Sequence, residues 1–225
     1  MDHRGAGGGL DVETLLRGRP DLVVAVSYGY GQVYGLDPDT AKHLEERVPV
    51  VVIDVGQART LDRVAERFAE LARSLGGAPV PAAAQDLGAA RDRLRAAAGA
   101  APGGPRVVAL SPAGREQAHG ARPAMWPERR VPAELGVTLV SPAEGPGVNW
   151  STTGWTQAAE LRPHIVLTDI RSHATPLVET DAPARSAVAR GARIVPWDPE
   201  PVCSPQARAR FLGLVADAVE AVAGG

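Results

Sequence analysis

The chain contains one short pattern twice, and this repeat restricts the fold more than any other feature of the sequence. It reads LLRGRPDLVVAV at residues 15–26 and AELRPHIVLTDI at residues 159–170. In both copies a helical pattern ends at Arg-Pro, one polar residue follows, and an apolar run begins. Proline stops a helix and favours extended backbone in the residue before it. The repeat therefore predicts the same helix-to-strand junction in each half, and so two similar α/β lobes.

Apolar runs alternate with helical patterns along the rest of the chain. The expected strands lie at 22–26, 48–55, 106–110, 136–140, 164–170 and 192–197. The expected helices begin after Thr60 and near 85, 153 and 205. Alternating strands and helices predict an α/β protein with mainly parallel sheets. We divide it into an N-terminal lobe (1–78), a connecting helix (79–104) and a C-terminal lobe (105–225), that is, two Rossmann-like lobes joined by a long connecting helix.

Composition excludes several classes of protein. The formal net charge is −2, which offers no basic surface for nucleic acid. Cys203 is the single cysteine, so an internal disulfide is impossible. No apolar run approaches the roughly 20 residues of a membrane-spanning helix. The opening MDHRGAGGGL lacks the apolar stretch of a signal peptide. The sequence as written predicts a soluble globular protein.

Three segments resemble a known family. RPDLVV (19–24), RPHIVL (162–167) and ARSAVARGARIVPWD (184–198) are similar to segments of the substrate-binding proteins of iron-siderophore and cobalamin ABC importers, which have the TroA-like or class III periplasmic-binding fold. His164 stands where the family usually has Asp. The resemblance implies a ligand held between two lobes, an ABC permease as partner, and no chemistry performed on the ligand.

The resemblance also implies a shortened start. Members of the family begin with a signal peptide and a lipid-attachment cysteine, followed by further strands and helices of the first lobe. We therefore expect a lipoprotein on the extracellular face of the membrane if the true start is upstream, and a cytoplasmic protein if Met1 is the real start.

Aromatic residues are few, and the tyrosines and tryptophans fall in or beside predicted loops. Because Tyr and Trp combine an apolar face with a polar group, they suit half-solvated binding sites. Ligands of open α/β sheets bind at loops that follow the carboxyl ends of strands. The candidate ligand-binding residues in such loops are Tyr28, Tyr30, Gln57, Arg115, Trp126, Asn149, Trp150 and Arg171. Arg171 is expected to offer a cationic fork to an anionic or carbonyl-rich ligand.

Other interpretations of these loops compete with ligand binding. We favour a place in the core for Trp155 and Trp197, at the edges of predicted elements. The stretch GPGVNWSTTGW (145–155) is interpreted as a connection in which Ser151 or a neighbouring Thr caps the next helix.

Enzymatic chemistry and direct metal binding are disfavoured. The five histidines show no HExxH spacing, and no GxSxG elbow is present. Asp54 and Asp169 end strands, where carboxylates more often hold loops than catalyse.

We expect no cofactor. A ferric siderophore, with hydroxamates first, would arrive already wrapped by its chelator, so its iron needs no protein ligand. Cobalamin and haem stay open as ligands. A cytoplasmic enzyme or sensor that reuses the fold, or an interaction module, are the alternatives.

Overall fold

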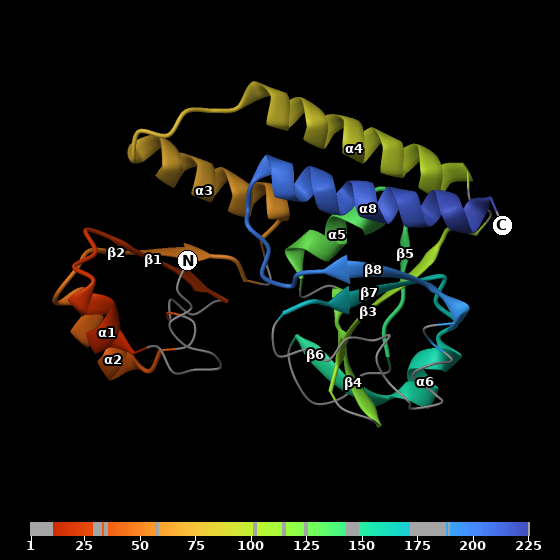
Figure 1. Ribbon diagram of the computed structural model, residues 1–225, viewed down its shortest axis with the longest axis horizontal. Helices are drawn as coiled ribbons and strands as arrows, with labels where there is room; N and C mark the ends of the chain where they lie inside the picture. Colours follow the sequence, from red (N-terminus) through yellow and green to blue (C-terminus); the bar gives the residue numbers. More distant parts are fainter. Residues whose placement is uncertain are drawn as a thin grey trace. The chain divides into compact units, whose positions relative to one another are not determined.

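The protein divides into two compact units, Met1–Ser74 and Leu75–Gly225. The computed structural model describes residues 11–28, 33, 36–56, 59–100, 103–113, 116–123, 126–142, 149–171, 188 and 190–224. Each unit has its own sheet, and each is described by itself below (Figure 1).

The first unit is built on two parallel strands. Its elements are α1 (Val12–Arg17), β1 (Val23–Ser27), α2 (Pro38–Glu45), β2 (Val50–Asp54) and α3 (Leu61–Ser74). Strand register pairs Val23 with Val50 and Ser27 with Asp54. Val12 of α1 and Leu44 of α2 form a small core against the face of the sheet that carries Val23 and Val50.

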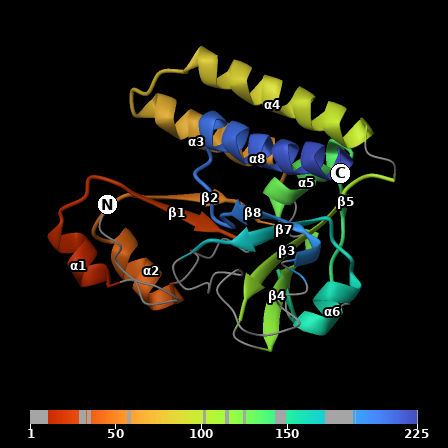
Figure 2. The same ribbon diagram turned by 45° about the vertical axis from the view of Figure 1, so that its right-hand side comes forward.

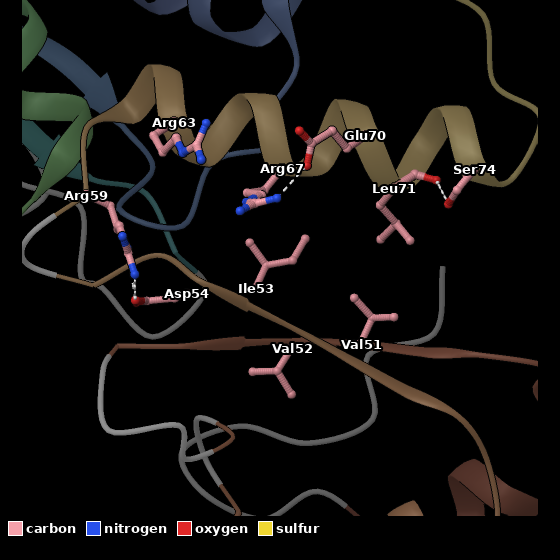
Figure 3. Close-up of a pocket in the computed structure, with 10 residues that line it drawn as sticks. All are labelled: Val51, Val52, Ile53, Asp54, Arg59, Arg63, Arg67, Glu70, Leu71 and Ser74. Atoms are coloured by element: carbon pink, nitrogen blue, oxygen red, sulfur yellow. Dashed lines mark hydrogen bonds and ion pairs between the residues drawn. The ribbon is translucent and has the colours of Figure 1, made fainter.

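The opposite face of this sheet is covered by α3. Alternate residues of a strand point to opposite faces, and Figure 3 shows Val51 and Ile53 directed toward α3 while Val52 points away. Val24 pairs with Val51 and so shares the α3 face, yet 44% of it is exposed. The helix therefore covers β2 more completely than β1.

The second unit contains a mixed sheet of six strands. The elements in chain order are α4 (Pro81–Ala100), β3 (Arg106–Pro112), β4 (Gln117–Ala121), α5 (Pro127–Glu134), β5 (Thr138–Leu139), β6 (Trp150–Gly154), α6 (Trp155–Glu160), β7 (Ile165–Asp169), β8 (Arg193–Trp197) and α8 (Pro205–Ala223). The order is β6-β4-β3-β7-β8, and the short β5 also pairs with β3. Strands β3, β5, β7 and β8 pair in parallel, whereas β4 and β6 are antiparallel to their neighbours.

Helices cover both faces of the larger sheet. Trp155 and Ala158 of α6 pack with Val108, Leu110 and Val166 on one face. The residues of β3 and β7 that alternate with Val108, Leu110 and Val166 are also buried, and they point to the opposite face of the sheet, toward α8. Figures 1 and 2 both show α4 running alongside α8, where Arg93 Nε donates to Glu220 Oε1 at 2.9 Å. The burial of strands on both faces explains why their sequences are nearly continuous apolar runs.

The two Arg-Pro junctions adopt the same backbone conformation. Arg19 and Arg162 have φ angles of 47° and 44°, the positive-φ residues other than glycine in the described part of the chain. The N–H of each donates to the carbonyl three residues earlier, that of Leu16 or Ala159, at 2.9 Å. The sequence repeat is thus a structural repeat, with a left-handed residue that turns the chain out of the helix before proline begins the extended segment.

The predicted α/β class and the mainly parallel pairing are confirmed, with three differences. The stretch around Trp150 is not a connection but strand β6, antiparallel to β4. Helix α6 begins at Trp155 with Gly154 as its N-cap, so the expected cap by Ser151 or a neighbouring Thr is wrong. Helix α4, expected to connect the lobes, packs along α8 within the second unit, and whether it also connects the lobes stays a prediction.

Candidate functional site

Strands β2 and β7 end in an aspartate and β8 is followed directly by one, and each aspartate fixes the start of the next loop. In each case one Oδ1 accepts the N–H of the residue two positions later. The pairs are Asp54 with Gly56 at 2.9 Å, Asp169 with Arg171 at 3.0 Å, and Asp198 with Glu200 at 2.9 Å. The expectation that strand-end carboxylates hold loops is confirmed for Asp54 and Asp169.

Arg171 is held between two carboxylates. Its Nη2 lies 2.7 Å from Asp169 Oδ2, and its Nη1 lies 3.1 Å from Glu200 Oε1. The Asp169 carboxylate is fully buried, and burial alone would raise its pKa. Hydrogen bonds from Arg171 and from Ser111 outweigh burial and hold the pKa of Asp169 below its usual value. The guanidinium is therefore fixed in place by a buried anion behind it and an exposed one beside it.

Three tryptophans form an aromatic cluster next to this guanidinium. The ring centroids of Trp126 and Trp150 are 5.1 Å apart, and Trp197 lies 5.8 Å from Trp126 and 5.9 Å from Trp150. Arg171 is placed over the Trp150 ring at 5.7 Å from its centroid. Trp126 and Trp197 are buried, whereas Trp150 is half-buried. Trp150 and Arg171 are thus the parts of this tryptophan–arginine cluster that reach its surface.

Polar groups anchor the buried side of the cluster. The Trp126 indole N–H donates to the Asn149 carbonyl at 3.0 Å. Arg129 is wholly buried, its Nη1 donates to the Ala121 carbonyl at 2.7 Å, and its guanidinium lies 5.9 Å from the Trp197 ring centroid. These contacts leave little freedom for Trp126 and Trp197, so the cluster is preorganised.

Strand register brings these residues together from distant parts of the sequence. Asp169 pairs with Trp197 across β7 and β8, so the loops that carry Arg171 and Glu200 leave the sheet side by side. Trp150 pairs with Ala121 across β6 and β4, which places Asn149 beside Arg122, whose N–H donates to the Asn149 carbonyl.

The structure brings four of the eight predicted ligand-binding residues together: Trp126, Asn149, Trp150 and Arg171. Tyr28 belongs to the first unit, directly after β1, where a Cβ on Gly56 would lie 2.5 Å from its carbonyl oxygen. That close approach requires glycine at position 56. Tyr30, Gln57 and Arg115 lie outside the described residues.

Sequence reasoning did not assign Asp169, Trp197 and Glu200 to the site. Trp197 was expected in the core and is buried there, but it also completes the aromatic cluster. The signal that could have found Glu200 is its position after β8, because the carboxyl ends of adjacent parallel strands meet at one edge of a sheet.

The first unit contains a pocket of about 580 Å³ between β2 and α3. Apolar side chains of Val51, Ile53 and Leu71 face it, together with three arginines (Figure 3). Each arginine already has an acidic partner; the pairs are Arg59 with Asp54, Arg63 with Glu66, and Arg67 with Glu70. The positive charges of the pocket are therefore paired with negative charges from the same unit.

The described residues of the two units contain neither a candidate metal site nor a membrane-spanning helix. No group of three or more His, Cys, Asp and Glu side chains is arranged to hold a metal ion there. Within that part of the chain, every helix is too short or too polar to span a membrane.

Solved structures of similar fold are binding proteins for iron chelates and haem. DesE, a ferric-siderophore receptor protein from Streptomyces coelicolor, is 24% identical, with a TM-score of 0.84 over 95% of this chain and 74% of its own. The siderophore binding protein FhuD from Vibrio cholerae, solved with Fe3+–Desferal, is 18% identical, with a TM-score of 0.66 over 97% of this chain and 82% of its own.

The periplasmic heme-binding protein BhuT is 23% identical, with a TM-score of 0.62 over 95% of this chain and 80% of its own. Neither a family model nor a curated protein matches the sequence. The chain therefore has the class III periplasmic-binding fold, as the resemblance of its Arg-Pro segments predicted.

Proposed function

We propose that this protein binds a ferric siderophore, or a metal chelate of similar size, and passes it to an ABC permease on the outer side of the membrane. The observation that carries the proposal is the preorganised tryptophan–arginine cluster at the carboxyl ends of β7 and β8, where open α/β sheets bind ligands. The fold shared with ferric-siderophore receptors supports the same conclusion.

The cluster fits a ligand whose metal is already coordinated. Indole rings and a guanidinium offer apolar faces and hydrogen-bond donors, which suit the organic shell of a chelate. The protein in this proposal performs no reaction on its ligand. The strand-end aspartates Asp54 and Asp169 accept backbone N–H groups and hold loops.

Haem is the second candidate ligand, because heme-binding proteins are among the structures of similar fold. Haem iron needs an axial protein ligand such as His, Cys, Met or Tyr. Binding of haem would therefore produce a Soret band shift characteristic of axial ligation, whereas a ferric hydroxamate would keep its own charge-transfer spectrum.

The test is a fluorescence titration with ferrioxamine B, hemin and cyanocobalamin. We expect saturable quenching by ferrioxamine B, since Trp150 lies at the surface of the cluster. Trp150→Phe is expected to weaken the affinity reported by the remaining tryptophans, while Trp155→Phe, a change in the core on the α6 side, is expected to leave the affinity unchanged. N-acetyltryptophanamide corrects for light absorbed by the ligands. No quenching by any of the three ligands would refute the proposal.

A further inference from the structure

We propose that the site selects chelates of zero or positive net charge and rejects anionic ones, and that Glu200 sets this preference. The inference rests on the proposed function and deepens it. The sequence led us to expect that Arg171 offers a cationic fork to an anionic or carbonyl-rich ligand; the inference keeps the carbonyl-rich ligand and drops the anionic one.

The charge of Arg171 is already compensated. Nε lies 3.1 Å from both Asp169 carboxylate oxygens, Nη2 lies 2.7 Å from Asp169 Oδ2, and Nη1 lies 3.1 Å from Glu200 Oε1. A guanidinium has five N–H groups. The two carboxylates take one from each nitrogen, so the second N–H on Nη1 and on Nη2 is what remains for a ligand oxygen.

Of the three charged groups in this ion-pair network, the most exposed is an acid. The Glu200 side chain is 46% exposed, compared with 20% for Arg171 and 0% for Asp169. Arg122 and Asp198, both half-buried beside the cluster, add one charge of each sign. At the Trp150–Arg171 surface the Glu200 carboxylate is therefore more accessible to a ligand than the Arg171 guanidinium beside it.

These features match the chemistry of neutral acceptor oxygens. Hydroxamate and amide carbonyls accept hydrogen bonds without bringing net charge, and a hydrocarbon linker can pack on the half-buried Trp150 ring. A pendant ammonium would be attracted to Glu200 and to the π-face of the cluster. A polyanionic chelate would be repelled by Glu200, and the Arg171 guanidinium, which is already paired, would not offset that repulsion.

The experiment compares three ferric chelates that share one iron-binding core and differ in net charge. Ferrioxamine B carries a free amine, its N-acetyl derivative is neutral, and its N-succinyl derivative is anionic, with nearly the same shape around iron. We expect affinity to fall in that order, by roughly three- to tenfold per unit of charge at low salt, and the differences to shrink in 0.5 M NaCl.

The matched variants are Glu200→Gln and Glu220→Gln. Both remove one carboxylate that pairs with an arginine and whose side chain is 46% exposed, but Glu220 lies near the end of α8 and pairs with Arg93. Glu200→Gln should raise affinity for the succinyl derivative and lower it for the amine, each measured relative to the acetyl derivative. Glu220→Gln should change none of the three.

The outcomes separate this inference from the function on which it rests. Equal binding of all three derivatives, or tightest binding of the succinyl derivative, overturns the charge preference and leaves siderophore binding intact. A preference that persists unchanged in Glu200→Gln overturns the role of Glu200. Absence of binding by all three derivatives overturns both proposals.

Discussion

Asp169 is a fully buried carboxylate whose charge is kept by its neighbours. Arg171 and Ser111 donate to it, and the result is a pKa below the usual value in spite of burial. Asp54 is likewise the last residue of its strand, β2, but its side chain is 41% exposed. The two residues therefore make the same local bond to the loop in very different surroundings, which allows the effect of burial to be measured.

Asp169→Asn should lower the free energy of unfolding by about 2–3 kcal/mol at pH 7, because Arg171 would lose its buried partner. Asp54→Asn should lower it by less than about 1 kcal/mol, since exposed pairs contribute little. Urea unfolding of each variant and the parent protein measures both values. Equal effects at the two positions would contradict the assigned role of burial.

The lowered pKa of Asp169 also predicts how the stability of the protein changes with pH. A carboxyl that is more acidic when folded stabilises the protein above its unfolded pKa of about 3.9, and that stabilisation is lost as pH falls through the folded pKa. The parent protein should therefore lose stability below about pH 4, and Asp169→Asn should show a shallower loss over the same range. Parallel curves of unfolding free energy against pH would contradict this.

Helix-to-strand junctions are the elements in which the chain stores backbone strain. Arg19 and Arg162 adopt positive φ angles immediately before proline, and both side chains are exposed. The second junction is further secured by Arg106, whose Nη2 donates to the Leu161 carbonyl at 2.7 Å. Left-handed backbone at a residue with a Cβ costs about 1–2 kcal/mol.

Arg162→Gly should raise the free energy of unfolding by about 0.5–1 kcal/mol, because glycine adopts positive φ without a Cβ clash and loses only part of that gain to chain entropy. Arg162→Val should lower it by about 1–2 kcal/mol, since a β-branched residue is strongly disfavoured there. Thermal unfolding of the two variants tests this, and identical stabilities would rule out the assigned strain.

Sequence patterns predicted the buried parallel strands and missed the two antiparallel ones. Strands β3, β7 and β8 are apolar on both faces, which is a strong signal. Strands β4 and β6 read QAHGA and WSTTG, with glycine and hydroxyl residues in place of an apolar alternation. Trp150 was expected in a connection, and its place on a strand depends on pairing with β4, a long-range contact that a local pattern does not reveal.

The same limit applies to the site. Arg171 was recognisable as a polar residue after a buried strand, but its compensation by Glu200 follows from the adjacency of β7 and β8. Their adjacency is a property of the assembled sheet, because 23 residues separate the end of β7 from the start of β8. Tertiary pairing, not local propensity, decides which loop residues meet.

At the scale of the whole molecule, the two units differ in size and in their aromatic residues. The first unit has a two-stranded sheet with an exposed valine on each face, whereas the second has six strands covered by helices. All four tryptophans lie in the second unit, and all three tyrosines lie in the first. Small sheets bury little apolar surface and are marginally stable.

Urea unfolding should therefore depend on the probe. Tryptophan fluorescence reports the second unit alone, while far-UV circular dichroism reports both. We expect an earlier transition in circular dichroism that fluorescence lacks, because the first unit unfolds at lower urea. Superimposable curves from the two probes would show that the units unfold together.

Asp54, Asp169 and Asp198 each accept the backbone N–H of the residue two positions later, and this bond does not depend on the side chain of that residue. Recognition loops rooted in this way can diverge without disturbing the strands beneath them. A library that keeps the three aspartates with their partners Arg59 and Arg171, and randomises the other loop residues, is the way to retarget the protein to new chelates on an unchanged framework.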